Sequence, residues 1–501
     1  MTTRRLVDVM VIGGRVGPLV SACLLARRGY KVVHVEHEGL ASSYRDNGLF
    51  LPLEPDLLPG PRSSPVIQHV LDGLALSTDA RRLLRPIQPG LQVITPGHRF
   101  ELSSESQRRG RELVREFGEE EAHELQKTIS ALLEADEAVD PLLASMPPLP
   151  PSNFRERRAI RKAASGLPID SDPPSFARSN TLRAASAGLA RISSFLAKPE
   201  PTGLHAVRCG ARMIREQPHR LLDGQQTHSN GYASLLRRRL QELGGVSLAD
   251  GQAVAEEILL EGRRVAGLKV LGDATDYRCR YLVSGIDTAS LDRILPLEGR
   301  RRRHDSFLDR VRPREILFSL NLVLRRKGFP AGLGEAALNI ADPGASLVEE
   351  NLILLEKFDA LDEEGPAHDV QVLQASCFAP VTRIDLGDGY FEDLRDRMLK
   401  VLRSDLLPFL DRHLLLTSSP VLTRKGRARG ARLMPHPLLE SDLEPSVGGG
   451  FLTPRTPYKN LVLAGREVLP GLGPEGEFLT GHRAAETVAY AMRKHDPLKH
   501  Q

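Results

Sequence analysis

The chain has 501 residues, of which 41% are hydrophobic and 26% are charged, and its formal net charge is +4. These values are ordinary for a globular protein, and the length allows roughly three domains. The small net charge does not indicate a nucleic-acid partner, so the many arginines are interpreted as a solvated surface. No run of 18 or more apolar residues predicts a transmembrane helix.

Cysteine usage and the N-terminus indicate the compartment. The four cysteines are far apart and form no CxxC pair, which argues against a zinc site and against a disulfide framework. They are Cys23, Cys209, Cys279 and Cys377. Asp8 interrupts the apolar run that a signal peptide would need. We therefore predict a cytoplasmic protein without a metal site.

Residues 8–36 have the order strand, glycine turn, helix, strand and acid, which is the plan of a dinucleotide-binding βαβ unit. Val9 to Ile12 is a short apolar run suited to a buried parallel strand. In such a unit the N-terminus of the helix faces a pyrophosphate. Glu36 follows Gly13 by 23 residues, close to the roughly 20 expected for the carboxylate that bonds ribose hydroxyls.

The glycine fingerprint of this unit is imperfect. Where G-x-G-x-x-G is expected, residues 13–18 are Gly-Gly-Arg-Val-Gly-Pro. Arg15 stands at the second glycine position, where the backbone approaches the phosphates, and Pro18 stands at the third. Proline costs little in a first helical turn, whereas the Arg15 side chain either adds positive charge or fills the phosphate site. The unit therefore either binds a dinucleotide or is a Rossmann half that has lost its ligand.

Residues 37–150 follow the second strand. Asp46-Asn47-Gly48 predicts a turn between short strands. Ser64 before Pro65 predicts the start of a helix. The region 61–150 is predicted to be mainly helical, with a charged helix from Arg109 to about Asp140.

Residues 152–225 have the least distinct pattern. A basic cluster extends from Arg155 to Lys162, and Leu182 to Leu196 then places apolar residues on one helical face, with Arg191 off that face. The helix either rests on a membrane surface, which would make this a peripheral membrane protein, or covers a core.

A clearer pattern resumes at residue 230. A helix with an apolar stripe from Tyr232 to Leu243 precedes a small β meander, in which Gly262 marks a hairpin turn. A second, mostly β region follows and contains one long helix. The predicted strands are 246–248, 254–260, 265–271, 280–284, 316–324, 351–355 and 370–376, and the predicted helix is 391–410.

The C-terminal motif identifies a family. Residues 460–465 (NLVLAG) form a buried strand that ends at a glycine, and residues 470–478 (PGLGPEGEF) lead into a helix. Together with the N-terminal βαβ unit and the helix and meander of residues 228–290, they resemble the FAD-dependent amine oxidase and phytoene desaturase-like superfamily, which includes carotenoid desaturases and isomerases.

The resemblance implies an α/β fold in which separated segments build a Rossmann-like FAD-binding domain and an α+β substrate domain is inserted between them. The implied FAD-binding domain comprises residues 1–60, 226–305 and 430–501, and the substrate domain comprises residues 61–225 and 306–429.

The resemblance also implies which residues contact FAD. At the adenosine and diphosphate end they are Gly13, Gly14, Arg15 and Gly17 at the pyrophosphate, Glu36 at the ribose and Val254 at the adenine. Ser284 and Gly285 would lie beside the cofactor, and Gly465 and Arg466 at the ribityl phosphate. The helix aimed at the flavin ring would carry Gly473, Glu475, Gly476, Glu477 and Phe478.

One family motif is missing. Relatives carry Gly-Gly-Arg a few residues after the ribose acid, whereas here residues 36–41 are Glu-His-Glu-Gly-Leu-Ala. Arg466 is a candidate for the missing positive charge, the alternative being a surface arginine. No Ser-His-Asp, HExxH or paired-carboxylate pattern is visible, and His205, His228 and His482 are interpreted as surface or core histidines, so no catalytic residue is predicted.

Two functions remain open at this stage. The first is an FAD-dependent oxidoreductase of the desaturase or isomerase type, which moves a hydride between a substrate C–H bond and the flavin. Its substrate would be a small, apolar molecule held in a tunnel between the domains. The second is a redox-inactive relative with a degraded pyrophosphate site, which acts as a binding or scaffold protein. The sequence gives no information on oligomeric state.

Overall fold

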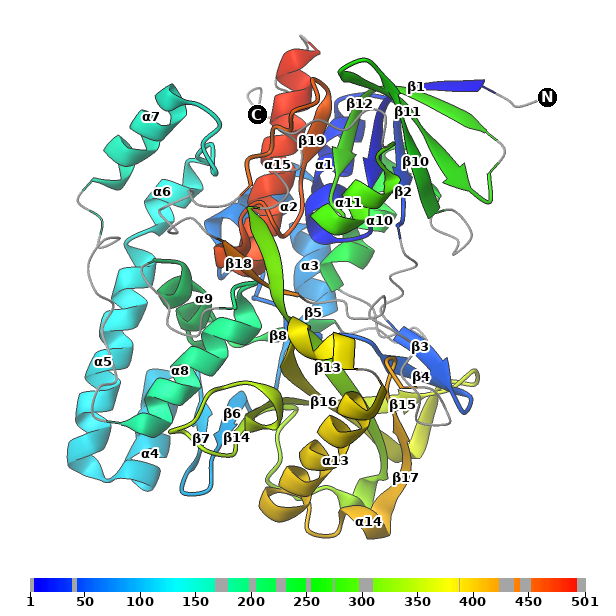
Figure 1. The fold of residues 1–501 in the computed structure, drawn as a ribbon. Coiled ribbons are helices and arrows are strands. Elements are labelled where there is room, and N and C mark those ends of the chain that lie inside the picture. Colours follow the sequence, from blue (N-terminus) through cyan, green and yellow to red (C-terminus); the bar gives the residue numbers. More distant parts are fainter. Residues whose placement is uncertain are drawn as a thin grey trace.

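The structure is a computed structural model that describes residues 4–37, 43–165, 167, 179–197, 204–221, 231–248, 254–273, 275–296, 310–386, 388–422, 437–441 and 452–492. Two sheets organise these residues, one in the upper half of Figure 1 and one in the lower half. Among the described helices, none combines the length and the apolar character needed to cross a membrane.

The first sheet is built around β1, which pairs in parallel with β2 on one side and with β12 on the other. β9 extends the sheet beyond β2, β19 lies beside β12, and β10 and β11 form the predicted antiparallel meander. The strands are β1 (Arg4–Ile12), β2 (Val32–Val35), β9 (Val246–Leu248), β10 (Val254–Glu261), β11 (Arg264–Leu271), β12 (Asp276–Ser284) and β19 (Leu461–Leu463).

Both faces of β1 are buried, as its unbroken apolar run predicts. Val9 and Val11 face a cluster that includes α1, α10 and α15, whereas Met10 and Ile12 face the meander and α11. The helices around this sheet are α1 (Val16–Arg27), α10 (Gly231–Glu242), α11 (Thr288–Ile294) and α15 (Gly473–Ala491). The predicted βαβ unit, meander and C-terminal strand and helix are therefore confirmed.

The second sheet is mostly antiparallel and is centred on the long strands β13, β15 and β16. Helix α13 covers one part of it through Phe391, Leu394 and Met398. Its strands are β3 (Ser43–Asp46), β4 (Leu49–Pro52), β6 (Leu91–Ile94), β7 (Arg99–Leu102), β13 (Val311–Arg325), β14 (Ala336–Ile340), β15 (Leu352–Leu361), β16 (Pro366–Pro380), β17 (Leu414–Ser418) and β18 (Leu438–Ser441), and a separate pair is formed by β5 (Leu84–Pro86) and β8 (His219–Leu221).

The remaining described helices lie mainly between the sheets or at one side of the molecule (Figure 1). They are α2 (Pro65–Gly73), α3 (Ser77–Leu83), α4 (Ser106–Phe117), α5 (Glu119–Glu137), α6 (Asp140–Ala144), α7 (Phe154–Ala164), α8 (Asn180–Ser193), α9 (Leu204–Arg215), α13 (Asp388–Asp405) and α14 (Leu410–His413). The predicted start of α2 is confirmed, because the Ser64 hydroxyl accepts a hydrogen bond from the Ile67 N–H.

Several predicted elements are corrected. The region 61–150 is mainly helical, as predicted, but it also contains strands that were not predicted. Residues 84–102 contribute β5, β6 and β7. The charged helix that was expected from Arg109 divides into α4 and α5 at Gly118, whose φ of 79° is a left-handed conformation that breaks a helix. The helix expected over residues 391–410 likewise ends at Asp405.

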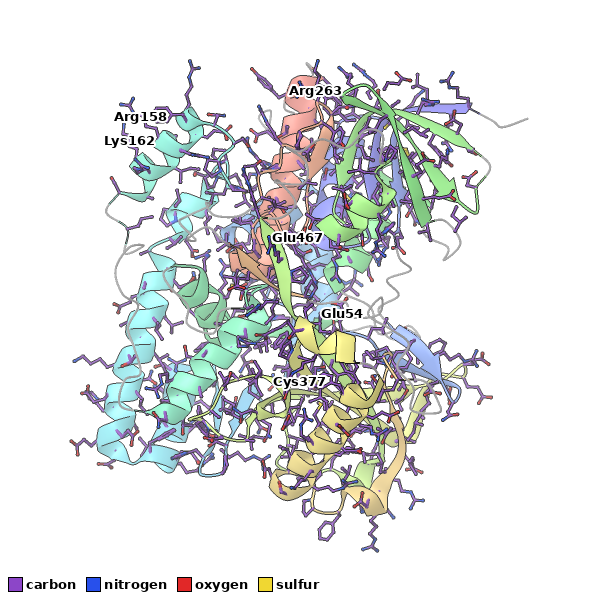
Figure 2. All side chains as sticks on the ribbon, in the orientation of Figure 1. Glu54, Arg158, Lys162, Arg263, Cys377 and Glu467 are labelled. Carbon is purple, nitrogen blue, oxygen red and sulfur yellow. The ribbon has the colours of Figure 1, made fainter. Side chains whose placement is uncertain are left out.

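Helix α8 covers a core rather than a membrane surface. Leu182, Ala185 and Leu189 are buried in a cluster that includes β6, β7, β14 and α9. Arg191, which the pattern placed off this face, is also buried and forms an ion pair with Glu315 on β13. The basic cluster from Arg155 to Lys162 is exposed on α7, where Arg158 and Lys162 project outward in Figure 2.

The predicted domain boundaries stay a prediction. The strands of the first sheet come from residues 4–35, 246–284 and 461–463. β3 and β4, which precede residue 60, join the second sheet through β15, and β18 joins it through β13.

Helices α1 and α15 cross at two glycines. A methyl group on Gly17 would overlap the carbonyl oxygen of Ala464, and one on Gly481 would overlap the carbonyl oxygen of Gly17. The absence of a side chain at these positions therefore permits the close approach of the two helices. This crossing fixes the first turn of α1 against α15.

Gly17→Ala is expected to destabilise the protein by about 1–3 kcal/mol, because the added methyl group forces a backbone shift in a packed core. Gly110→Ala on α4 is the matched control, since a Cβ there meets no atom within 4 Å. Urea unfolding followed by circular dichroism measures both variants. Equal unfolding midpoints for Gly17→Ala and the unsubstituted protein would contradict the close crossing.

Candidate functional site

The site predicted from the sequence lies at one edge of the first sheet. Ile12 is in register with Val35 on β2 and with Ser284 on β12, and Ser284 is in register with Leu463 on β19. The turns after these parallel strands therefore meet at the same edge, where ligands of open α/β sheets bind. Gly13, Glu36, Gly285 and Gly465 are in these turns.

The turn from β1 into α1 accommodates both departures from the glycine fingerprint. Gly13 has a φ of 112° and supplies the glycine conformation of the turn. Arg15 has a φ of −85° and a ψ of 174°, an extended backbone that does not require glycine. Pro18 packs against Gly285, where a Cβ would collide with the proline ring. Close packing at this turn therefore depends on two other glycines. Gly17 directly precedes Pro18, and Gly285 lies against the proline ring.

The N-terminus of α1 is buried and has no side-chain cap. Arg15 is the N-cap residue and its side chain accepts no hydrogen bond from the first turn, which also contains no acidic residue. The unpaired N–H groups and the partial positive charge of a helix end favour an anion at such a place. This end of α1 therefore keeps the electrostatic character of a phosphate site.

Glu36 and His34 support the same turn from β2. Glu36 forms an ion pair of 2.6 Å with Arg237 of α10, and Arg237 also donates a hydrogen bond to the carbonyl oxygen of Gly14. Burial lowers the pKa of His34 to about 4, so its imidazole is neutral and donates from Nε2 to the carbonyl oxygen of Gly13 at 2.9 Å. Arg237 thus places a guanidinium beside the phosphate turn, although the Gly-Gly-Arg arginine is absent.

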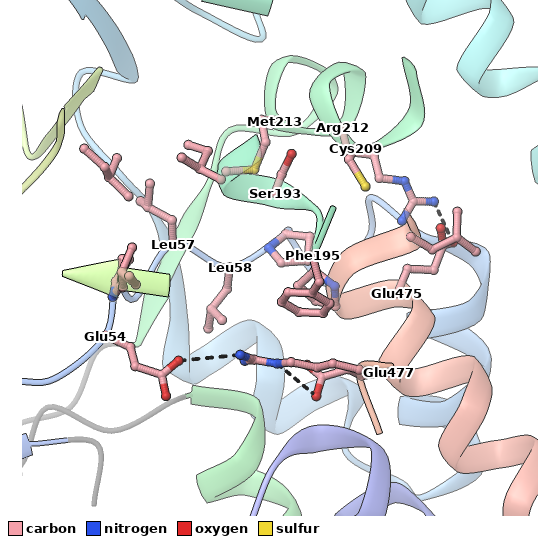
Figure 3. A pocket seen from close by; sticks show the side chains of 18 of the residues that line it. Glu54, Leu57, Leu58, Ser193, Phe195, Cys209, Arg212, Met213, Glu475 and Glu477 are labelled. Carbon is pink, nitrogen blue, oxygen red and sulfur yellow. Dashed lines mark hydrogen bonds and ion pairs between the residues drawn. The ribbon is translucent and has the colours of Figure 1, made fainter. Parts of the chain in front are cut away.

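A chain of charged side chains extends from this turn toward α15. The two Arg15 guanidinium nitrogens lie 3.2 and 3.3 Å from the Glu54 carboxylate, and Arg466 lies 3.7 Å from the same carboxylate. Arg466 also lies 3.5 Å from Glu477 and stacks on the ring of Phe195. The Arg466 side chain is only 10% exposed, so the alternative of a surface arginine is wrong. Figure 3 shows the links from Glu54 and Glu477 to the central guanidinium.

A second charged cluster surrounds Glu475 in the first turn of α15. Its carboxylate accepts hydrogen bonds from Arg208, Arg212 and the Ser64 hydroxyl at 2.6–3.0 Å. These partners outweigh its burial and lower the pKa of Glu475 to about 2. The fully buried Arg208 also binds Asp136 and Asp140, which connects α9 and α15 to α5 and α6.

A cavity lies between these two charged groups. About 1060 Å³ of space is free of atoms here, a volume that includes the open mouth and the solvent in it. Val16 of α1 and Leu472, Pro474, Glu475 and Glu477 line it, and most of its other lining side chains are apolar (Figure 3). The apolar lining residues are Leu57, Leu58, Ile192, Phe195, Met213, Leu317, Leu352, Leu354, Phe378 and Leu472.

The comparisons with known proteins concern the fold. No protein-family model matches the sequence, and no curated protein matches it. Solved structures do match along nearly the whole chain. Wild-type putrescine oxidase bound to putrescine has 13% sequence identity and a TM-score of 0.56, and the match covers 98% of this chain and 100% of the oxidase. Cyclohexylamine oxidase from Brevibacterium oxydans has 14% identity and a TM-score of 0.55, with 97% and 100% coverage. An oxidoreductase from Methanosarcina mazei has 15% identity and a TM-score of 0.55, with 97% and 100% coverage.

The chain has the fold of the amine oxidases. In this amine-oxidase fold, the sequence-predicted site residues are in the turns after β1, β2, β12 and β19 and in the first turns of α15, and Val254 begins β10. Glu38 to Ala41, which replace the Gly-Gly-Arg motif, and His228 lie outside the described residues. Roles of individual residues in ligand binding remain predictions.

Several residues of the site were not found by sequence reasoning. Glu54 follows a short strand and Arg208 and Arg212 are on a helix in the least distinct region, so no motif marked them. Arg237 is on the predicted helix that carries the Tyr232 stripe, and a charged residue there resembles any solvated position. Only their distances in the folded chain show that they belong to the site.

Glu467 lies directly after Arg466 and is buried. Its carboxylate accepts hydrogen bonds from the Thr288 N–H at 2.8 Å and from the Thr288 hydroxyl at 3.3 Å. Burial and, to a smaller extent, the nearby Asp287 raise the pKa of Glu467 to about 8. The folded protein therefore holds this proton at pH values at which the unfolded chain has lost it.

A carboxyl group with a raised pKa makes the folded state less stable as the pH rises between its ordinary value of 4.5 and about 8. Glu467→Gln removes this titration, so the stability of the variant relative to the unsubstituted protein is expected to increase from pH 5 to pH 8. The slope is at most about 1.4 kcal/mol per pH unit. Unfolding midpoints measured across this range test it, and a constant difference between the two proteins would refute the raised pKa.

Proposed function

We propose that this protein is an FAD-dependent oxidoreductase that acts on a mostly apolar small molecule bound in the cavity between the two sheets. The observation that supports this most directly is the position of the cavity. Val16 of α1 and Pro474, Glu475 and Glu477 of α15 line it, so both helix N-termini that the resemblance assigns to FAD border the same space.

The described residues fit FAD. The uncapped N-terminus of α1 has the character of a diphosphate site. Arg15 and Arg237 place guanidinium donors beside it, each already paired with a carboxylate, of Glu54 and of Glu36. Glu36 ends the second strand at the position of a ribose-binding carboxylate. Gly465 and the first turn of α15 continue toward the cavity, where residues 472–475 would border the ring.

FAD would supply the redox chemistry, accepting a hydride from a substrate C–H bond when it is bound. The chain itself would orient the substrate and exclude water, since most of the cavity wall is apolar. The partial positive charge at the N-terminus of α15 would favour negative charge nearby. Desaturation and isomerisation are the reaction types proposed, by analogy with the superfamily that the sequence resembles.

The chain from Arg15 through Glu54 to Arg466 and Glu477 favours a second candidate function. These four side chains link the phosphate turn to the first turns of α15, and all are at most 23% exposed. If this chain occupies the path of the ribityl group, the fold serves as a redox-inactive binding protein for the molecule in the cavity.

An FAD titration separates the two functions. The purified protein is expected to bind FAD, detected by quenching of flavin fluorescence and by a yellow colour that persists after gel filtration. Arg15→Ala is expected to weaken FAD binding by roughly tenfold, because a guanidinium beside the diphosphate is lost. Arg158→Ala, an exposed site on α7, is the control. Failure of the unsubstituted protein to bind FAD, combined with binding by Arg15→Ala, would refute the oxidoreductase and support the second candidate.

A further inference from the structure

Arg212 has a hydrogen-bonding edge that no described residue satisfies. Its side chain is 5% exposed and lines the cavity. Nη2 donates to Glu475 at 2.6 Å, whereas Nη1 has no hydrogen-bond partner and Nε has only a 4.0 Å ion-pair contact with Asp136. Figure 3 shows Glu475 joined to one side of this guanidinium. An unpaired buried donor destabilises the site, so a ligand acceptor at Nη1 would recover that loss.

The surrounding charges are already balanced. In the cluster of Glu475, the arginines Arg208, Arg212 and Arg215 face the carboxylates of Asp136, Asp140 and Glu475. Glu137, which is 61% exposed, adds a contact of 3.6 Å to Arg215. In the chain at the other side of the cavity, Arg15 and Arg466 face Glu54 and Glu477. A charged ligand would therefore bring an uncompensated charge into a poorly hydrated space, which is costly.

We propose that the molecule bound in this cavity is neutral and mostly apolar, and that a carbonyl or hydroxyl oxygen of it accepts a hydrogen bond from Arg212 Nη1. This assignment rests on the proposed function in taking the cavity as the substrate site. The apolar body packs against the wall formed by Leu57, Met213, Leu352 and Phe378. The site thus differs in substrate charge from the structurally similar protein that was solved with putrescine, a diamine.

The balance of charge decides between neutral, anionic and cationic substrates. A carboxylate would find the Arg212 donor but would face Glu475 at the same guanidinium. An ammonium ion would find Glu477, whose charge Arg466 already compensates at 3.5 Å. A neutral oxygen acceptor satisfies Nη1 and leaves both charge sums unchanged.

Three probes with the same chain length test this: 2-decanone, decanoate and decylamine. Calorimetric titration of the full-length protein, both without flavin and with added FAD, gives their dissociation constants. We expect 2-decanone to bind at least tenfold more tightly than the other two. Arg212→Lys keeps the positive charge beside Glu475 but removes the second planar donor, so the affinity for 2-decanone is expected to fall by roughly tenfold.

Arg215→Lys, on the same helix but outside the cavity lining, is the matched control and is expected to bind 2-decanone unchanged. Tighter binding of decanoate or decylamine, no binding of 2-decanone, or equal affinity in Arg212→Lys would each overturn the proposal. Binding of 2-decanone that depends on Arg212 in a protein that takes up no FAD would support this assignment and refute the oxidoreductase. Uptake of FAD without binding of 2-decanone would overturn this assignment and support an FAD-binding protein.

Discussion

The close crossing of α1 and α15 is the constraint on which the rest of the structure depends. Gly481 of α15 lies against the carbonyl of Gly17 in α1, and Gly17 itself lies against the carbonyl of Ala464 in the turn after β19, so a side chain at either glycine would collide with backbone. One helix follows the first strand of the chain and the other follows the last strand of the same sheet. Their crossing therefore brings the two ends of a 501-residue chain together. Both helix N-termini border the cavity as a consequence.

Buried ion pairs then connect this sheet to the surrounding elements. Arg208 joins α9 to α5, α6 and α15, and Glu54 joins the segment after β4 to the turns after β1 and β19. A buried ion pair is weak evidence for stability, since desolvation offsets most of the attraction. Removal of one partner is costly, however, because it leaves an unpaired buried charge. We infer that these contacts fix the geometry of the cavity rather than add much stability.

The sequence predicts the parts of the fold that repeat a local pattern. The apolar run at Val9, the Ser64 cap before Pro65 and the NLVLAG strand each have a physical signature within a few residues, and each is confirmed. The short strands β6 and β7 were missed, since four residues give too little periodicity to separate them from a helical region. The break between α4 and α5 depends on the left-handed conformation of one glycine, Gly118, within a run of strong helix formers.

The site is predictable only in its backbone. The glycine turns and the first turn of α15 could be located from spacing, because the conformation of a glycine turn and the start of a helix depend on a few neighbouring residues. The side chains that surround the cavity come from segments separated by more than 100 residues: Glu54, Arg212 and Arg466. Their charges become meaningful only when the distances between them are known. Pro18 is likewise accommodated because Gly285, which follows another strand of the sheet, leaves room for the proline ring. The sequence does not reveal this contact.

The central claim is that the N-termini of α1 and α15 converge on one coenzyme. A crystal structure of the protein grown with FAD tests it most directly. The account predicts density for a diphosphate at the start of α1 and for a flavin ring that borders, but does not fill, the cavity at the start of α15. Density that shows no flavin, with the Arg15, Glu54 and Arg466 contacts intact across that path, would contradict it.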